Sequence, residues 1–177
     1  MTDTLRLERT DRIMTLTLDR PPLNILDLET LERLGALIGD LPEDEIQLLV
    51  VRSASAKAFS AGVAVDDHTP DKIDRMLSLF HAALESLRRL PFPTLAAVEG
   101  HCLGGGLELA AACDFILAST SARLGQPEIQ LGCFPPYAAA LYPSRIGYAR
   151  TLELLLTGRI VDAEDRRQVF VARLGDR

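Results

Sequence analysis

The sequence predicts an α/β protein in which parallel strands are connected by helices. Short apolar runs, typical of buried strands, alternate along the chain with segments whose apolar residues have helical spacing. With 47% hydrophobic residues, the 177-residue chain can bury a substantial core, so we expect one domain over residues 1–177. A run of three glycines, Gly104–Gly106, lies between a strand pattern and a helix pattern, where the backbone must turn sharply.

In the first half of the chain, apolar residues recur at every second position near the start and at helical spacing in two later segments. Apolar and polar residues alternate on both sides of a Thr10-Asp11 turn, which indicates a hairpin. Asp27 precedes the first helical pattern and is the expected N-cap. The predicted elements are a hairpin at 4–18, a helix at 27–39, a strand at 46–51, a polar loop at 53–62 and a helix at 71–90.

The second half alternates between the same two patterns. Gly158 is expected to end the last helix, and the charged tail from Asp162 is either a frayed helix or the beginning of another unit. The predicted elements are a strand at 94–100, a helix at 107–113, a strand at 114–119, an extended segment and turn at 122–132, a short helix within 134–147 and a helix at 149–158.

Composition excludes several classes of function. The formal net charge of −6 argues against a surface that binds nucleic acid or an anionic membrane. Neither a signal peptide nor a transmembrane run is visible in the sequence, so we expect a cytoplasmic protein whose three cysteines are free thiols. The histidines His68, His81 and His101 are interpreted as structural, and no metal site is predicted.

Four positions have the residue types needed to stabilise an oxyanion and transfer protons. The first N–H groups after Gly104–Gly106 would lie free at a helix N-terminus and could bind a developing oxyanion, although the glycines could also serve packing alone. Gly62 could present free N–H groups or form an ordinary turn. Glu108 is either a catalytic carboxylate or a helix N-terminal acid. Glu128 follows Pro127, which would fix its direction, and it could equally be a surface acid.

Five segments in this order resemble the enoyl-CoA hydratase/isomerase, or crotonase, superfamily. They are RPPLNILD at 20–27, KAFSAGV at 57–63, PTLAAVEGHCLGGGLELAAACDFILAS at 93–119, ARLGQPEIQLG at 122–132 and ELLLTGR at 153–159. The resemblance implies the ClpP/crotonase fold, a spiral of ββα units that assembles as trimers or dimers of trimers. It also implies that most of the family's usual C-terminal helical region is lacking here.

The resemblance implies a site for an acyl-CoA thioester, with CoA as part of the substrate and no other cofactor. Its oxyanion donors would be the N–H groups of Val63 and Gly105. Glu108 would activate water and Glu128 would protonate the α carbon, in a hydration or dehydration reaction. The residues implied in contact with substrate or CoA are Leu23, Ala61, Gly62, Ala64, Val65, Gly104 and Pro127.

Two stretches resemble one subfamily in particular, and the sequence departs from the usual family pattern in three places. FSAGVAVDDHTPDK and GQPEIQLGCFPPYAAALYP resemble cyclohexa-1,5-diene-1-carbonyl-CoA hydratases, and the bulky Phe134–Tyr137 run could suit a ring substrate. Ala64 replaces the family's usual Asp, Val169 stands where glycine is expected, and the chain is short. Two alternatives therefore stay open: a double-bond isomerase that uses one glutamate, and an inactive homologue that binds acyl-CoA or a partner.

Overall fold

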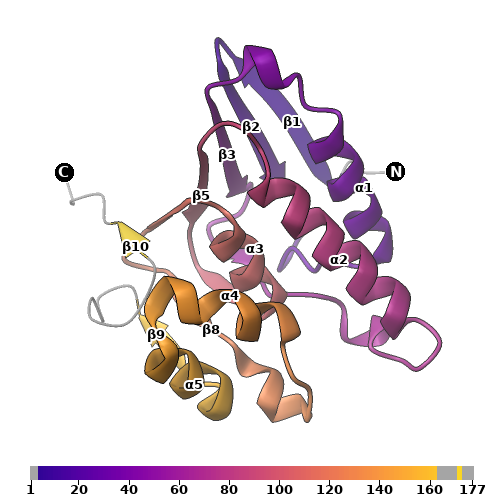
Figure 1. Ribbon diagram of the computed structural model, residues 1–177, viewed down its shortest axis with the longest axis vertical. Helices are drawn as coiled ribbons and strands as arrows, with labels where there is room; N and C mark the ends of the chain where they lie inside the picture. The colour runs from indigo at the N-terminus through magenta and orange to yellow at the C-terminus, as the bar shows by residue number, and fades with distance from the viewer. Residues whose placement is uncertain (1–3, 163–170, 173–177) are drawn as a thin grey trace.

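The computed structural model describes residues 4–162 and the backbone of residues 171–172. Within these residues the strands form two sheets (Figure 1). The larger sheet has the order β1-β2-β3-β5-β7-β10, and its strands are β1 Leu5–Thr10, β2 Ile13–Leu18, β3 Leu48–Ser53, β5 Thr94–Val98, β7 Phe115–Ala118 and β10 Val171–Ala172. The smaller sheet has the order β4-β6-β8-β9, and its strands are β4 Ala58–Ser60, β6 His101–Leu103, β8 Arg123–Gly125 and β9 Ile160–Asp162.

The larger sheet begins with the predicted hairpin and continues with parallel strands. β1 and β2 are antiparallel, and Asp11 takes a positive φ of 53° in the turn between them. The β2–β3, β3–β5 and β5–β7 pairs are all parallel, as the alternation of strands and helices predicted. The strand predicted at 46–51 corresponds to β3, which begins and ends two residues later than predicted, since Gln47 lies outside the strand pairing.

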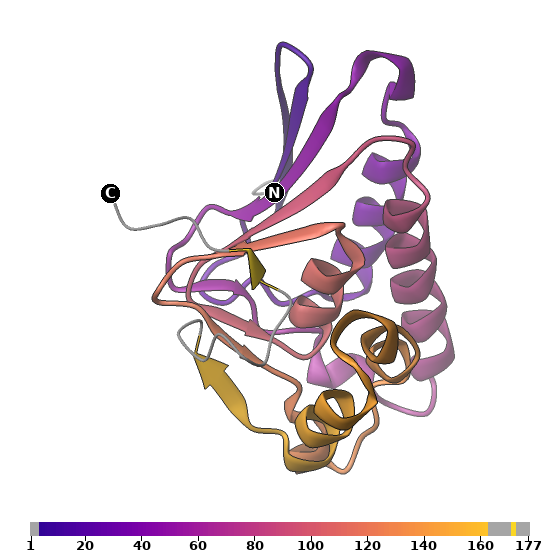
Figure 2. The ribbon, with the colours of Figure 1, turned by 60° about the vertical axis from the view of Figure 1, so that its left-hand side comes forward.

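Two long helices pack side by side along one face of the larger sheet (Figures 1 and 2). They are α1, Leu28–Gly39, and α2, Ile73–Arg88. The carboxylate of Asp27 accepts a hydrogen bond of 3.0 Å from the Thr30 N–H, which confirms the predicted N-cap. The apolar stripes of both helices, which include Leu34 and Leu84, are buried in the core.

One predicted loop is wrong. The segment 53–62 contains the strand β4, Ala58–Ser60, whose three residues are fully buried and pair in parallel with β6. A strand of three residues is too short to show an alternating pattern, and its polar neighbours in the sequence concealed it. The side-chain amide of Asn24 donates hydrogen bonds to the carbonyls of Ala58 and Phe59, which ties β4 to the N-terminal segment.

Three shorter helices complete the described chain. They are α3 Gly105–Ala112, α4 Pro136–Ile146 and α5 Tyr148–Thr157. Gly158 ends α5 with a φ of 61°, as predicted. The extended segment expected at 122–132 consists of β8 and a 3-10 turn, η3, at Pro127–Leu131.

The predicted tail, including Val169, lies outside the described residues except for Asp162 and the backbone of residues 171–172. None of the helices in the described part of the chain is both long and apolar enough to span a membrane.

Candidate active site

Two glycine-containing segments meet at one end of the smaller sheet. β4 and β6 are parallel neighbours, so the segments that follow them, 61–63 and 104–106, leave the sheet at the same edge. A Cβ atom built on Gly105 would lie 3.2 Å from the Val63 nitrogen, and one on Gly106 would lie 2.3 Å from the Ser60 carbonyl oxygen. A side chain at Gly106 would collide with backbone, and one at Gly105 would collide with the Val63 side chain, so the close approach depends on glycine.

The N–H groups of Val63 and Gly105 have no acceptor in the described chain. Leu26 forms a parallel bridge with Val63: its N–H donates to the Gly62 carbonyl, and its carbonyl accepts from the Ala64 N–H. The Val63 N–H therefore points away from this bridge. Gly105 is the first residue of α3, where an N–H has no intrahelical partner. Both residues line one cavity, which makes them suitable donors for a single oxygen atom.

Glu108 lies in the first turn of α3 and is only 4% exposed. Its Oε1 accepts a hydrogen bond of 2.7 Å from the backbone N–H of Ala138, in the first turn of α4. Burial raises the pKa of Glu108 to about 8; the Ala138 bond opposes this rise and the negative charge of Glu128 adds to it. Glu108 is therefore a carboxyl group that can hold a proton near neutral pH.

Glu128 lies on η3 against the glycine run. A Cβ atom built on Gly104 would lie 2.7 Å from its Oε1, which places this oxygen directly over the turn. The same oxygen accepts a hydrogen bond of 3.1 Å from the Gln126 amide, whereas Oε2 is buried and has no hydrogen-bond partner in the described chain. Burial raises the pKa of Glu128, and the Gln126 bond opposes this rise.

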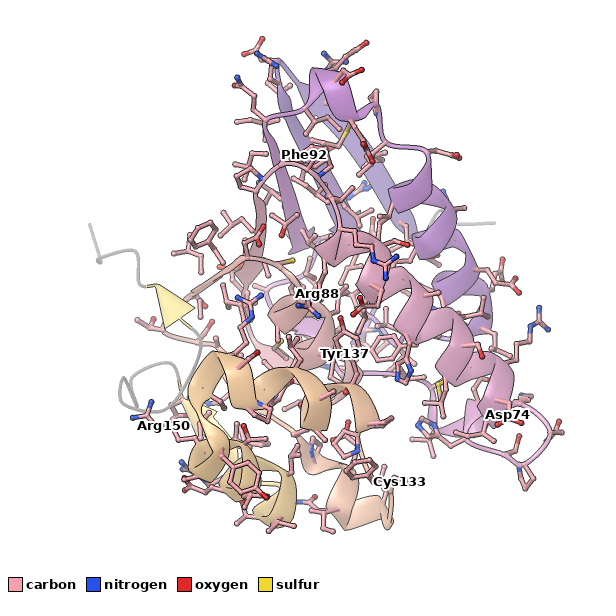
Figure 3. All side chains as sticks on the ribbon, viewed as in Figure 1. Asp74, Arg88, Phe92, Cys133, Tyr137 and Arg150 are labelled. Carbon is pink, nitrogen blue, oxygen red and sulfur yellow. The ribbon has the colours of Figure 1, made fainter. Side chains whose placement is uncertain are left out.

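The cavity has a volume of about 520 Å³. The two glycine segments and the two glutamates form one side of it. The rest of its lining comes from α2, from the end of η3 and from the segment that leads into α4, in which Figure 3 shows Cys133. This wall is mainly apolar, and its residues include Met76, Leu77, Phe80, His81, Leu131, Phe134, Pro135 and Pro136.

Most of the predicted site residues line this cavity together. They are Ala61, Gly62, Val63, Val65, Gly104, Gly105, Glu108, Pro127 and Glu128. Leu23 and Ala64 do not line it, and they hold the loop instead: the Ala61 N–H donates to the Leu23 carbonyl, and the Ala64 N–H donates to the Leu26 carbonyl. The role of each residue in substrate binding stays a prediction.

The arrangement of two N–H donors beside the buried carboxyl group of Glu108 and the half-buried one of Glu128 coincides with a sequence match. A profile of the enoyl-CoA hydratase/isomerase family matches residues 8–172. The chain belongs to the enoyl-CoA hydratase/isomerase family. The predicted crotonase fold is confirmed as well, because an enoyl-CoA hydratase crystal structure from Bacillus anthracis superposes with a TM-score of 0.91 at 30% identity, covering 97% of this chain and 69% of that one.

Two curated relatives in the family are similar over most of this chain. A cyclohexa-1,5-dienecarbonyl-CoA hydratase of Thauera aromatica is 37% identical over 163 residues, which cover 92% of this chain. A probable enoyl-CoA hydratase of Rhizobium meliloti (strain 1021) is 38% identical over 176 residues, which cover 97% of this chain. The matched region spans 63% of the length of the first relative and 68% of the length of the second.

The structure also brings residues to the family's site that sequence reasoning missed. Gln126 and Tyr142 are fully buried and form a hydrogen-bonded connection to Glu128. His68 and His81, interpreted above as structural, both lie on the cavity wall. Gln126 could have been predicted as a site residue, because it lies directly before Pro127-Glu128. Tyr142 could not, because it is 16 residues farther along the chain and no local pattern connects it to the site.

Proposed function

We propose that the protein adds water to the double bond of an α,β-unsaturated acyl-CoA, or removes water in the reverse reaction. The supporting observation is that the free N–H groups of Val63 and Gly105 line the same cavity as the carboxyl groups of Glu108 and Glu128. The thioester oxygen would accept from both N–H groups and gain negative charge as water adds. Losing one such donor typically costs about 3–4 kcal/mol of transition-state stabilisation.

The two glutamates would supply the base and the acid. In hydration, Glu108 would take a proton from water while the oxygen bonds to the β carbon, and Glu128 would give a proton to the α carbon. This chemistry needs one proton on the pair, and burial favours that state by raising the pKa of both groups. Because neighbouring carboxylates titrate jointly, the division of roles is part of the proposal.

A cyclic dienoyl-CoA is the proposed substrate class. The apolar wall of the cavity is formed partly by Phe134, Pro135 and Pro136, whose ring-shaped side chains could pack against a ring substrate. The 37% identity to a relative named cyclohexa-1,5-dienecarbonyl-CoA hydratase supports the same choice. The proposal requires no metal or redox cofactor, because CoA enters as part of the substrate.

The test is a spectrophotometric assay of the purified chain with crotonyl-CoA and cyclohexa-1,5-diene-1-carbonyl-CoA. Loss of the conjugated thioester absorbance with the cyclic diene, and not with crotonyl-CoA, is the expected result. Turnover in ¹⁸O-labelled water should place the label in the product, whereas a double-bond isomerase incorporates none. Binding of both esters without any turnover would contradict the proposal and favour an acyl-CoA-binding protein.

We also propose that the chain assembles as a trimer or a dimer of trimers. Apolar side chains that remain exposed on η3, on the segment before α4 and on α5 support this proposal, because such patches commonly mark interfaces. They are Ile129, Leu131, Phe134, Tyr148 and Leu156. Sedimentation velocity should give the mass of three or six chains, and a monomer at micromolar concentration would exclude it.

A further inference from the structure

A buried side-chain connection links helix α4 to the carboxyl group of Glu128. The Tyr142 hydroxyl donates a hydrogen bond of 2.8 Å to the Gln126 carbonyl oxygen, Oε1. The Gln126 amide nitrogen then donates one of 3.1 Å to Glu128 Oε1. Tyr142 and Gln126 are each 0% exposed. Burial restricts the geometry of this connection, because turning the amide over would bring its oxygen against the carboxylate of Glu128.

The direction of the two hydrogen bonds follows from the chemistry of the groups. An ionised carboxylate can only accept, so the nitrogen of the Gln126 amide must face Glu128 and its oxygen must face Tyr142. The tyrosine must then donate, which it can do because burial raises the pKa of Tyr142 well above its ordinary value. Oε1 of the ionised Glu128 thereby accepts from the Gln126 amide, whereas Oε2 is buried and has no hydrogen-bond partner in the described chain.

The same helix also holds the other carboxyl group. The Ala138 N–H donates to Glu108 Oε1, and Ala138 lies four residues before Tyr142, so both face the site from adjacent turns of α4. α4 therefore fixes Glu108 directly and Glu128 through Gln126.

We propose that Tyr142 and Gln126 are positioning residues that hold the carboxyl group of Glu128 at its Oε1 oxygen and so fix its orientation beside the glycine run. This inference rests on the proposed hydration chemistry for its catalytic consequence. In the proposed reaction, neither Tyr142 nor Gln126 touches the reacting atoms. Their effect comes from occupying Oε1 and from orienting the carboxyl group over Gly104.

Other charged groups around Glu128 set the background for this effect. Glu108 on α3 is close enough for the two carboxylates to influence each other, and a positive charge on His68, in the segment after β4, lowers the pKa of Glu128. Tyr142 also lies close enough to Glu108, Cys102 and Glu128 to interact with them electrostatically. The same change of the Glu128 titration in Tyr142→Phe and in Gln126→Met therefore identifies the Gln126 hydrogen bond as its cause.

The experiment compares the full chain with Tyr142→Phe and Gln126→Met. Turnover of the dienoyl-CoA should show kcat lowered roughly tenfold in Tyr142→Phe, as expected for losing about one hydrogen bond, with KM nearly unchanged. In the original chain, the Gln126 hydrogen bond stabilises the charged form of Glu128. Weakening or removing it should raise the pKa of Glu128, so the pH profile of kcat should move to higher pH in both variants. A ¹³C NMR titration of labelled glutamate carboxyl carbons, with Glu128→Gln to assign the signal, should show the same upward movement without any turnover.

Tyr137→Phe is the matched control, because it removes a hydroxyl group from the same helix. That hydroxyl donates to Glu85 on α2 and does not reach Gln126. Its pH profile and its Glu128 titration should match those of the unsubstituted chain. The inference is overturned if Tyr142→Phe also leaves the Glu128 titration unchanged. Absence of turnover in the unsubstituted chain would instead count against the proposed function, and the NMR titration would still decide the positioning role.

Discussion

The two sides of the cavity are built in different ways. On one side, the segments 61–63 and 104–106 pack so closely that a methyl group added at Gly62, Gly104, Gly105 or Gly106 would lie within 3.0 Å of another atom. On the other side, side chains from α2 and from the segment before α4 form the wall, and one of them, Phe134, is 66% exposed. The first side tolerates almost no change of shape, whereas the exposed part of the second, at Phe134, can change its side chain and keep the fold.

In the proposed reaction, this difference means that one side of the cavity carries out the chemistry and the other selects the substrate. Oxyanion donors supplied by the main chain are the same for every acyl group, because every substrate presents the same thioester oxygen. A wall of side chains contacts the part of the substrate that varies. Substitutions on the glycine side should therefore act mainly on kcat, and substitutions on the wall should act mainly on the preference between substrates.

The largest effect is expected from Glu128→Gln, which keeps the shape of the side chain and removes its acid function. Turnover should fall by about 10²- to 10⁴-fold, while the affinity for the CoA ester is retained. Steady-state kinetics and isothermal titration with a CoA ester measure the two quantities. Turnover within a few-fold of the original value would remove Glu128 from the mechanism.

Gly105→Ala should follow, with kcat lowered by roughly 100-fold through displacement of one oxyanion donor. The added Cβ would lie 2.8 Å from the Val63 Cγ2 atom and 3.2 Å from the Val63 nitrogen, so both donors would move apart. Gly35→Ala is the matched control, because a Cβ on Gly35 in α1 meets no atom within 4 Å. Equal kcat values in the two variants would show that the glycine side is no more constrained than a helix surface.

An intermediate effect on stability is expected from Glu108→Gln, and it should depend on pH. The pKa of Glu108 rises from 4.5 to about 8 on folding, so between these values the folded state binds more protons than the unfolded state. Stability contributed by this group is therefore lost as pH rises through that range. Glutamine does not ionise, so the melting temperature of the variant should exceed that of the original chain increasingly from pH 5 to pH 8. A difference that is constant with pH would contradict the raised pKa.

Phe134→Ala should produce the smallest effect. Opening the wall should change the ratio of kcat/KM for the cyclic and the linear ester by about 10-fold or less, in favour of the linear ester. Phe115→Ala on β7 is the control, since Phe115 is 56% exposed and does not line the cavity. An unchanged ratio in Phe134→Ala would mean that the wall does not select the acyl group.

The sequence predicted those features that depend on local patterns. The helical stripe on α2, the cap at Asp27 and the turn at Gly158 all follow from neighbouring residues, and each is confirmed. β4 was missed because its three residues are identified as a strand only through pairing with β6. The same limit applies to Tyr142 and His81, whose places at the cavity result from the packing of α4 and α2.

The bridge between Leu26 and Val63 shows how an unfinished sheet edge can acquire a use. Along a strand that has a partner on only one side, alternate amides point outward without an acceptor, and such edges invite unwanted pairing with other chains. Here the outward amide belongs to a single residue that lines the cavity. The feature that makes exposed edges prone to aggregation is thus limited to one N–H group, which in the proposed reaction would bind the substrate oxygen.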